Sequence, residues 1–108
     1  MSHDSPAVAV IFISTRTDGH ASAYQRDAAT METLAREQPG FLGLESVRDA
    51  VTARGITVSL WSDEACALAW KQVAEHLRVQ QQGRDRYYRE YEVLVTQVLR
   101  SYRFSNER

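Results

Sequence analysis

Hydrophobic and polar positions follow two periods along the chain, and these periods predict six elements. Apolar residues that recur every three or four positions predict helices over about 22–37 and 63–81. Other segments are rich in β-branched residues or alternate between apolar and polar positions, which predicts strands over 8–14, 41–48, 55–61 and 87–103. The order β-α-β-β-α-β is the ferredoxin-like pattern, so we expect an α+β fold with a four-stranded antiparallel sheet.

Capping residues locate the predicted helix ends. Ser22, followed three residues later by Gln25, has the pattern of a capping box at the start of the first helix, and residues 38–40 end that helix. Ser62 is the expected N-cap of the second helix, and Gly83 is its expected stop.

The first and last strands are apolar at consecutive positions, over 8–13 and 93–95. An antiparallel sheet with one face in water should alternate cleanly, so the second face of this sheet needs a cover. The same face of a second copy is the simplest cover. The sequence therefore predicts a homodimer of sheets packed face to face, built from one domain over residues 1–108 with its core at about 8–104.

Composition narrows the possible partners. The net charge of −1 argues against a nucleic-acid or membrane partner, although basic and aromatic residues gather between 84 and 91. No apolar run is long enough to span a membrane, and residues 1–7 lack the features of a signal peptide, so we expect a cytoplasmic protein.

The single cysteine, Cys66, lies where a helix start would favour a thiolate. The preferred interpretation is that Cys66 is a small buried side chain that fills space in the core.

Five segments resemble one branch of the antibiotic biosynthesis monooxygenase family: AVIFIS (9–14), LAREQPGFLGLESVR (34–48), GITVSLWSDEA (55–65), AWKQVAEH (69–76) and QQGRDRYYREY (81–91). The resemblance implies a dimeric α+β barrel with a cavity between sheet and helices in each subunit. It also implies oxidation of quinols, anthrones or other electron-rich aromatics by O2 without metal or flavin. Another branch of the family degrades haem, and many members have no known activity, so the family alone does not fix the reaction.

The haem-degrading branch carries an Asn on its first strand and a widely spaced Trp and His on its second helix. Here Ser14 lies near the Asn position, no Asn precedes Asn106, and Trp70 and His76 are only six residues apart. We therefore expect no cofactor, and keep haem binding through His76 as an alternative. We see no clustered metal ligands either.

Cofactor-free oxygenation of an aromatic needs a pocket that binds the substrate, removes a proton and excludes water. His76 is the candidate base, because a helical wheel places it about 80° from the centre of the face formed by Cys66, Val73 and Leu77, at the boundary of that face. The alternative is a structural histidine. The candidate substrate-binding residues, for which core packing, surface pairing and dimer-rim contacts are the alternatives, are Trp61, Trp70, Ser14, Arg16, Arg84, Tyr87 and Tyr88.

The sequence thus favours a small dimeric monooxygenase for an electron-rich aromatic. The alternatives are a non-catalytic module of the same fold that binds a small hydrophobic molecule or haem, and an accessory protein whose dimer surface is its function.

Overall fold

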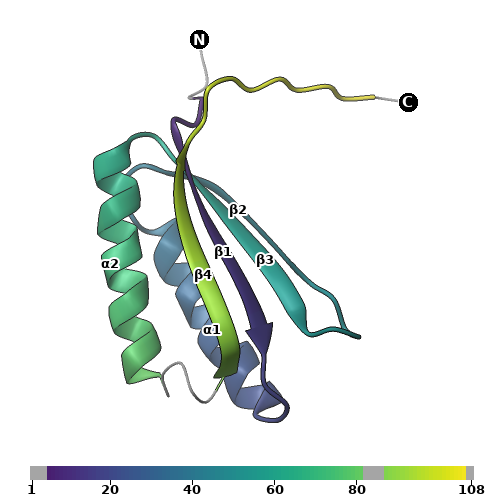
Figure 1. The fold of residues 1–108 in the computed structure, drawn as a ribbon. Coiled ribbons are helices and arrows are strands. Elements are labelled where there is room, and N and C mark those ends of the chain that lie inside the picture. Colours follow the sequence, from purple (N-terminus) through teal and green to yellow (C-terminus); the bar gives the residue numbers. More distant parts are fainter. Residues whose placement is uncertain (1–4, 82–86, 107–108) are drawn as a thin grey trace.

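The computed structural model describes residues 5–81 and 87–106 and contains all six predicted elements in the predicted order. They are β1 (Val8–Arg16), α1 (Ala21–Arg36), β2 (Phe41–Arg48), β3 (Arg54–Trp61), α2 (Glu64–Gln80) and β4 (Tyr88–Gln97). The sheet order is β2-β3-β1-β4 with every neighbouring pair antiparallel, and both helices cover the same face (Figure 1). The ferredoxin-like α+β prediction is confirmed.

The last strand is shorter than predicted. It ends at Gln97, and only Val98 continues the pairing by donating its backbone N–H to the carbonyl of Ala7 at 2.9 Å. Residues 99–106 lie beside no strand that the structure describes and extend away from the body as an arm (Figure 1). The apolar positions of that arm satisfied the strand pattern, but a strand also needs a neighbour to pair with.

Both predicted helix N-caps are wrong. The N-cap of α1 is His20 at a left-handed φ of 58° without a side-chain cap, so Ser22 lies inside the helix. The N-cap of α2 is Asp63 rather than Ser62, and its carboxylate accepts the backbone N–H of Cys66 at 2.8 Å. That hydrogen bond, with one from the Cys66 thiol, holds the pKa of Asp63 below its usual value. Gly83, the predicted stop of α2, is outside the described residues.

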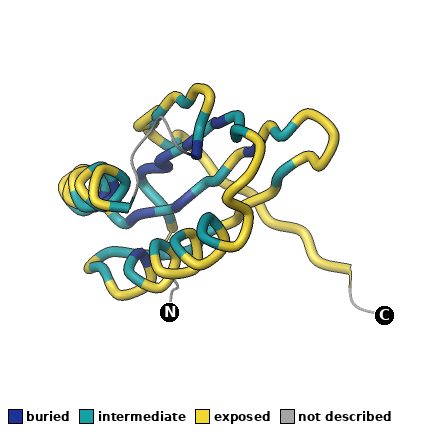
Figure 2. Tube along the Cα trace, turned by 90° about the horizontal axis from the view of Figure 1, so that it is seen from below, coloured by how far each residue is buried: buried dark blue, intermediate teal, exposed yellow. Residues whose placement is uncertain are grey.

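The hydrophobic core lies between the sheet and the helices, and the outer sides of the helices are exposed (Figure 2). Trp61 is its centre: the side chain is fully buried, its ring stacks on Trp70 at 6.1 Å, and its indole N–H donates to Ser59 at 2.9 Å. The buried side of α2 is formed by Ala67, Trp70 and Ala74. Within the described residues, neither helix is long and apolar enough to cross a membrane.

The opposite face of the sheet carries a second apolar surface, as the strand patterns predicted. In the strand register, Ile11 lies between Val58 and Leu94, and Ile13 lies beside Ile56. Leu94 is 38% exposed and Ile56 is 42% exposed. We call these five residues the bare face. No element of the described chain covers it.

Candidate functional site

A cavity of about 370 Å³ lies between the sheet and the two helices. This is near the lower end of the range for small-molecule sites, about 300–1,000 Å³. Its walls are mostly apolar and come from every layer: Val10, Phe12, Leu44 and Val93 from the sheet, Ala28 and Met31 from α1, and Trp70 and Ala74 from α2. One end is polar, and we call its residues, Tyr24, Asp27, Tyr87 and Tyr88, the polar end.

An irregularity in β4 puts two of its tyrosines on the same side of the sheet. Thr15 pairs with Glu90 and Arg16 pairs with Tyr88, so Arg89 is an extra residue in β4. With this bulge, Tyr88 and Tyr91 face the same side, although they are an odd number of residues apart. Both rings contact Phe12, at centroid distances of 5.4 Å and 5.2 Å.

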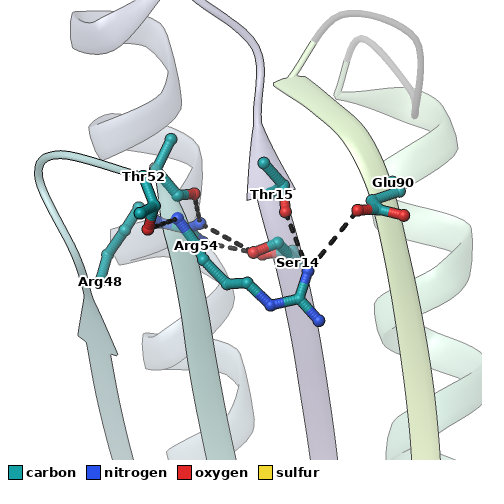
Figure 3. A network of polar contacts seen from close by, with 7 residues as sticks. Ser14, Thr15, Arg48, Thr52, Arg54 and Glu90 are labelled. Atoms are coloured by element: carbon teal, nitrogen blue, oxygen red, sulfur yellow. Dashed lines mark hydrogen bonds and ion pairs between the residues drawn. The ribbon is translucent and has the colours of Figure 1, made fainter.

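Arg48 lies behind the polar end and connects three elements. From the end of β2 it reaches across β3 to β1, where its Nη2 donates to the hydroxyl of Ser14 at 2.9 Å (Figure 3). The same nitrogen donates to the hydroxyl of Tyr24 on α1 at 3.2 Å, and Nη1 donates to the carbonyls of Ala53 at 2.7 Å and Ser14 at 3.3 Å. Ser14 is fully buried, so this guanidinium satisfies polar groups that water does not reach.

A glycine makes room for that guanidinium. Gly55 is the partner of Arg48 in the β2–β3 register and of Ser14 in the β3–β1 register. A Cβ at Gly55 would lie 2.6 Å from Cζ of Arg48 and 2.9 Å from both terminal nitrogens. The absence of a side chain at Gly55 therefore allows Arg48 to lie across β3.

Arg16 adds a second positive charge beside Tyr24. Its Cζ lies 4.0 Å from the centroid of the Tyr24 ring, and Nη2 donates to the carbonyl of Gly19 at 2.9 Å. Within the described chain, neither Arg16 nor Arg48 forms an ion pair with a carboxylate. Both charges therefore favour an anion at this end of the cavity.

Asp27 places a carboxylate at the polar end. It lies one helical turn after Tyr24 on α1, and its Oδ2 accepts a short hydrogen bond of 2.6 Å from the hydroxyl of Tyr87. Tyr87 is itself only 5% exposed. No described residue donates to Oδ1 of Asp27, so this oxygen is available to a ligand.

Burial raises the pKa of Tyr88 well above its ordinary value, and the neighbouring Tyr24 acts in the same direction. Tyr88 therefore remains a neutral hydroxyl donor at physiological pH. Arg78 also lines the cavity, with its Cζ 4.2 Å from the centroid of the Phe12 ring. The polar end thus combines hydroxyl donors, a carboxylate and guanidinium groups around an aromatic pocket.

The predicted substrate-binding residues differ in their position relative to the cavity. Tyr87, Tyr88 and Trp70 line the cavity. Ser14 and Arg16 lie directly behind it, through their contacts with Arg48 and Tyr24. Trp61 packs behind Trp70 in the core and does not line the cavity, and Arg84 lies outside the described residues.

His76 does not occupy the boundary position that was predicted for it. It is exposed, and it is not among the residues that line the cavity. The prediction centred the inner face of α2 on Cys66, Val73 and Leu77, whereas Ala67, Trp70 and Ala74 are the buried residues. His76 is nine residues after Ala67, about 180° around the helix. Its assignment as a base stays a prediction.

Sequence reasoning missed Tyr24, Asp27 and Arg48. In the sequence, Tyr24 shares helical spacing with Ala28, Met31 and Ala35, which indicates the apolar side of a helix and gives no sign of a role for its hydroxyl. The signal that could have found Arg48 is the short connection between the predicted strands 41–48 and 55–61, because pairing these two strands places this arginine opposite a glycine.

Two other predictions concern cysteine and metal chemistry. The pKa of the Cys66 thiol is raised by its hydrogen bond to Asp63, by burial and by the Asp63 charge, so the thiolate expected at a helix start is disfavoured. Among the described residues, no group of three or more His, Cys, Asp or Glu side chains could hold a metal ion.

Known proteins resemble this chain in sequence and in fold. The uncharacterized protein YqjZ of Bacillus subtilis (strain 168) is 41% identical over 95 residues, which cover 88% of this chain and 82% of YqjZ. Rv0793 from Mycobacterium tuberculosis superposes with a TM-score of 0.72 at 20% identity, covering 90% of this chain and 98% of its own. SnoaB from Streptomyces nogalater, named a cofactor-independent oxygenase, superposes as a variant with a TM-score of 0.71 at 14% identity, covering 90% and 97%.

At these identities the two solved structures show a shared fold and leave the chemistry open. The family is shown by sequence. Because the model of the antibiotic biosynthesis monooxygenase family matches residues 6–82, the chain belongs to that family.

Proposed function

We propose that this protein is a monooxygenase that oxidises a small electron-rich phenol, quinol or anthrone with O2 and without a bound cofactor. The observation that carries the proposal is the cavity, whose aromatic walls end in three tyrosines and a carboxylate. Family membership supports the reaction class, as does the description of SnoaB, which shares the fold, as a cofactor-independent oxygenase.

The reaction starts with removal of a proton, because a neutral aromatic reacts slowly with O2 and its anion is a much better electron donor. For a phenol, the O–H proton and one ring hydrogen are lost and one oxygen atom of O2 becomes the second carbonyl of a quinone. The other oxygen atom leaves as water with the two hydrogens. The enzyme has to bind the anion and keep the reacting carbon away from bulk water.

We assign the proton acceptor to Asp27. Asp27 lines the cavity, its Oδ1 has no donor among the described residues, and Tyr87 fixes the carboxylate through Oδ2. A positioned base of this kind contributes about 10²–10⁴-fold to the rate. The exposed His76 has no comparable place at the cavity.

The test measures oxygen uptake and quinone absorbance with an anthrone or a quinol as substrate. Asp27→Asn retains an oxygen that accepts the hydrogen bond from Tyr87, but the amide cannot take a proton from the substrate. We therefore expect kcat to fall about 10²–10⁴-fold. His76→Ala is the control and should keep the full rate. Loss of rate in His76→Ala with full rate in Asp27→Asn would move the base to His76. Saturable binding by the wild type without oxygen uptake would support the non-catalytic binding module instead.

We also propose that the protein works as a homodimer through the bare face. Its exposed apolar side chains, Ile56 and Leu94 among them, are flanked by the charged Arg54 and Glu90, which form an ion pair with 3.5 Å between nitrogen and oxygen (Figure 3). An apolar centre with a charged rim is the usual composition of a protein interface. The exposed arm supports self-association as well, because Leu99 is 80% exposed and Tyr102 is 87% exposed.

A further inference from the structure

We propose, resting on the proposed function, that the hydroxyl of Tyr24 donates a hydrogen bond to the oxyanion of the aromatic substrate, and that Arg48 is the positioning residue that directs this hydroxyl. The site would therefore bind phenolates and enolates in their anionic form, and would bind the neutral aromatic only through its apolar walls. The direction of the hydrogen bond between Arg48 and Tyr24 and the positive charges beside Tyr24 both favour this role.

The hydrogen-bond directions follow from the chemistry of the partners. Arg48 is a guanidinium, which has no acceptor, so in its 3.2 Å contact with Tyr24 the tyrosine oxygen must accept. The single proton of Tyr24 is then left for another partner, and Tyr24 lines the cavity.

Accepting a hydrogen bond from the Arg48 guanidinium makes the Tyr24 hydroxyl a stronger donor, because hydrogen bonds in a chain polarise one another. An O–H donor aimed at the position of a developing negative charge stabilises that charge most in a site that excludes water. Asp27, one turn further along α1, would take the proton as Tyr24 stabilises the oxygen that loses it. The two groups therefore have complementary roles at one substrate oxygen.

The charges point to the same ligand. Arg16 lies over the Tyr24 ring, with 4.0 Å between Cζ and the ring centroid, and Arg48 lies 5.7 Å from the same centroid. Neither guanidinium pairs with a carboxylate of the described chain. Two guanidinium groups that pair with no described carboxylate, beside a hydroxyl donor, favour an anionic oxygen over a neutral one.

Arg48 acts through Tyr24 and has no place in the cavity wall itself, since it is absent from the residues that line the cavity. Its other hydrogen bonds, to Ser14 and Ala53, fix the guanidinium on the sheet, so its direction is set before any ligand enters. This makes it a positioning residue.

The experiment uses 4-nitrophenol, a probe whose phenolate absorbs visible light and whose binding needs no turnover. Wild-type protein should bind the phenolate more tightly than the neutral phenol, so the titration of the bound probe should move to lower pH. Tyr24→Phe keeps the ring that Arg16 contacts and removes only the hydroxyl. We expect it to weaken phenolate binding about tenfold and to change binding of the neutral phenol less than about twofold. Tyr91→Phe, which alters a nearby tyrosine outside the cavity lining, is the matched control and should behave as wild type.

Arg48→Lys keeps the charge and loses the fixed fork of donors. It should weaken phenolate binding in the wild-type background but have no further effect in Tyr24→Phe, because a positioning residue acts only through its partner. Equal phenolate binding by wild type and Tyr24→Phe, or no phenolate binding by the wild type, would overturn the inference. Additive effects of the two substitutions would remove the positioning role of Arg48. Tyr24-dependent phenolate binding without any oxygen uptake would leave the inference standing and refute the proposed function.

Discussion

Gly55→Ala should detach Arg48 without removing any group of the site. The added methyl would lie 2.6 Å from Cζ of Arg48, well inside the contact distance of about 3.5–4.0 Å. Gly55 does not have a positive φ, so the backbone accepts alanine without strain. The atom in the way is the end of a flexible side chain, and the clash is therefore relieved by movement of the guanidinium away from β3.

The size of the effect follows from the four hydrogen bonds that the guanidinium makes, to Ser14 twice, to Ala53 and to Tyr24. Each is worth about 1 kcal/mol net, and a buried partner left unsatisfied costs about 1–3 kcal/mol. Ser14 is fully buried, whereas Ala53 and Tyr24 are partly accessible to replacement water. Alanine in a strand regains about 0.5–1 kcal/mol over glycine. We expect a net loss of about 2 kcal/mol in the free energy of unfolding.

The assay is thermal unfolding followed by circular dichroism, in parallel with the 4-nitrophenol titration. A loss of about 2 kcal/mol should lower Tm by about 10 °C in a domain of this size, and phenolate binding should weaken about tenfold as in Tyr24→Phe. Gly43→Ala is the matched control, because a Cβ there would meet only Leu60, at an ordinary 3.9 Å. A Gly55→Ala variant that melts at or above the temperature of Gly43→Ala and binds phenolate like the wild type would show that Gly55 does not hold Arg48 in place.

Three further predictions concern other parts of the molecule. Because the pKa of the Cys66 thiol is raised, iodoacetamide at pH 8 should alkylate Cys66 more slowly than free cysteine, as followed by mass spectrometry. An equal or faster rate would contradict the raised pKa. The folded-state pKa of Asp63 is lowered, so its stabilising effect is fully present above the unfolded value of about 3.9 and is lost as the pH falls through the folded value. Urea unfolding should therefore show Asp63→Ala less stable than wild type at pH 6 and nearly equal at pH 2, and a constant difference would exclude the cap. Ile56→Glu puts a charge on the bare face and should weaken the proposed dimer more than about tenfold by light scattering at micromolar concentration, unlike the exposed control Val79→Glu on α2.

The fold was predictable because the strands and helices differ in period. The unbroken apolar run at the start of β1 predicted a strand with two apolar faces, and the alternation from 55 to 61 predicted its neighbour. The side of α2 that faces the sheet was less predictable. Residues 65–70 of α2 are all apolar, so several inward faces fit the spacing, and the chosen one placed His76 at a boundary. Only contact with the sheet selects Ala67, Trp70 and Ala74.

The site was only partly predictable, because its geometry depends on breaks in regular structure. Period-two alternation puts Tyr88 and Tyr91 on opposite faces, and the bulge at Arg89 brings them to the same side. Arg48 ends a strand in an ordinary position, and its role arises from a glycine on the neighbouring strand. The tyrosine and aspartate of α1 are one turn apart, which a helical wheel could have shown had Tyr24 been considered as a hydroxyl.

Stability and chemistry are separated along β1, and this separation sets the orientation of a bound ligand. The helix-facing side chains of β1 begin with Val8 beside Trp61 and end with Ser14 and Arg16 beside the polar end. Arg16 is about 26 Å from Val8 at the usual rise of a strand. Phe12 lies between and forms part of the cavity wall. An aromatic substrate can contact both the apolar wall and the polar end of the cavity only with its apolar rings toward Trp70 and its oxygen toward Tyr24. Substitutions at Trp61 should then change stability while the bound phenolate still titrates as in the wild type, and substitutions at Tyr24 should do the reverse.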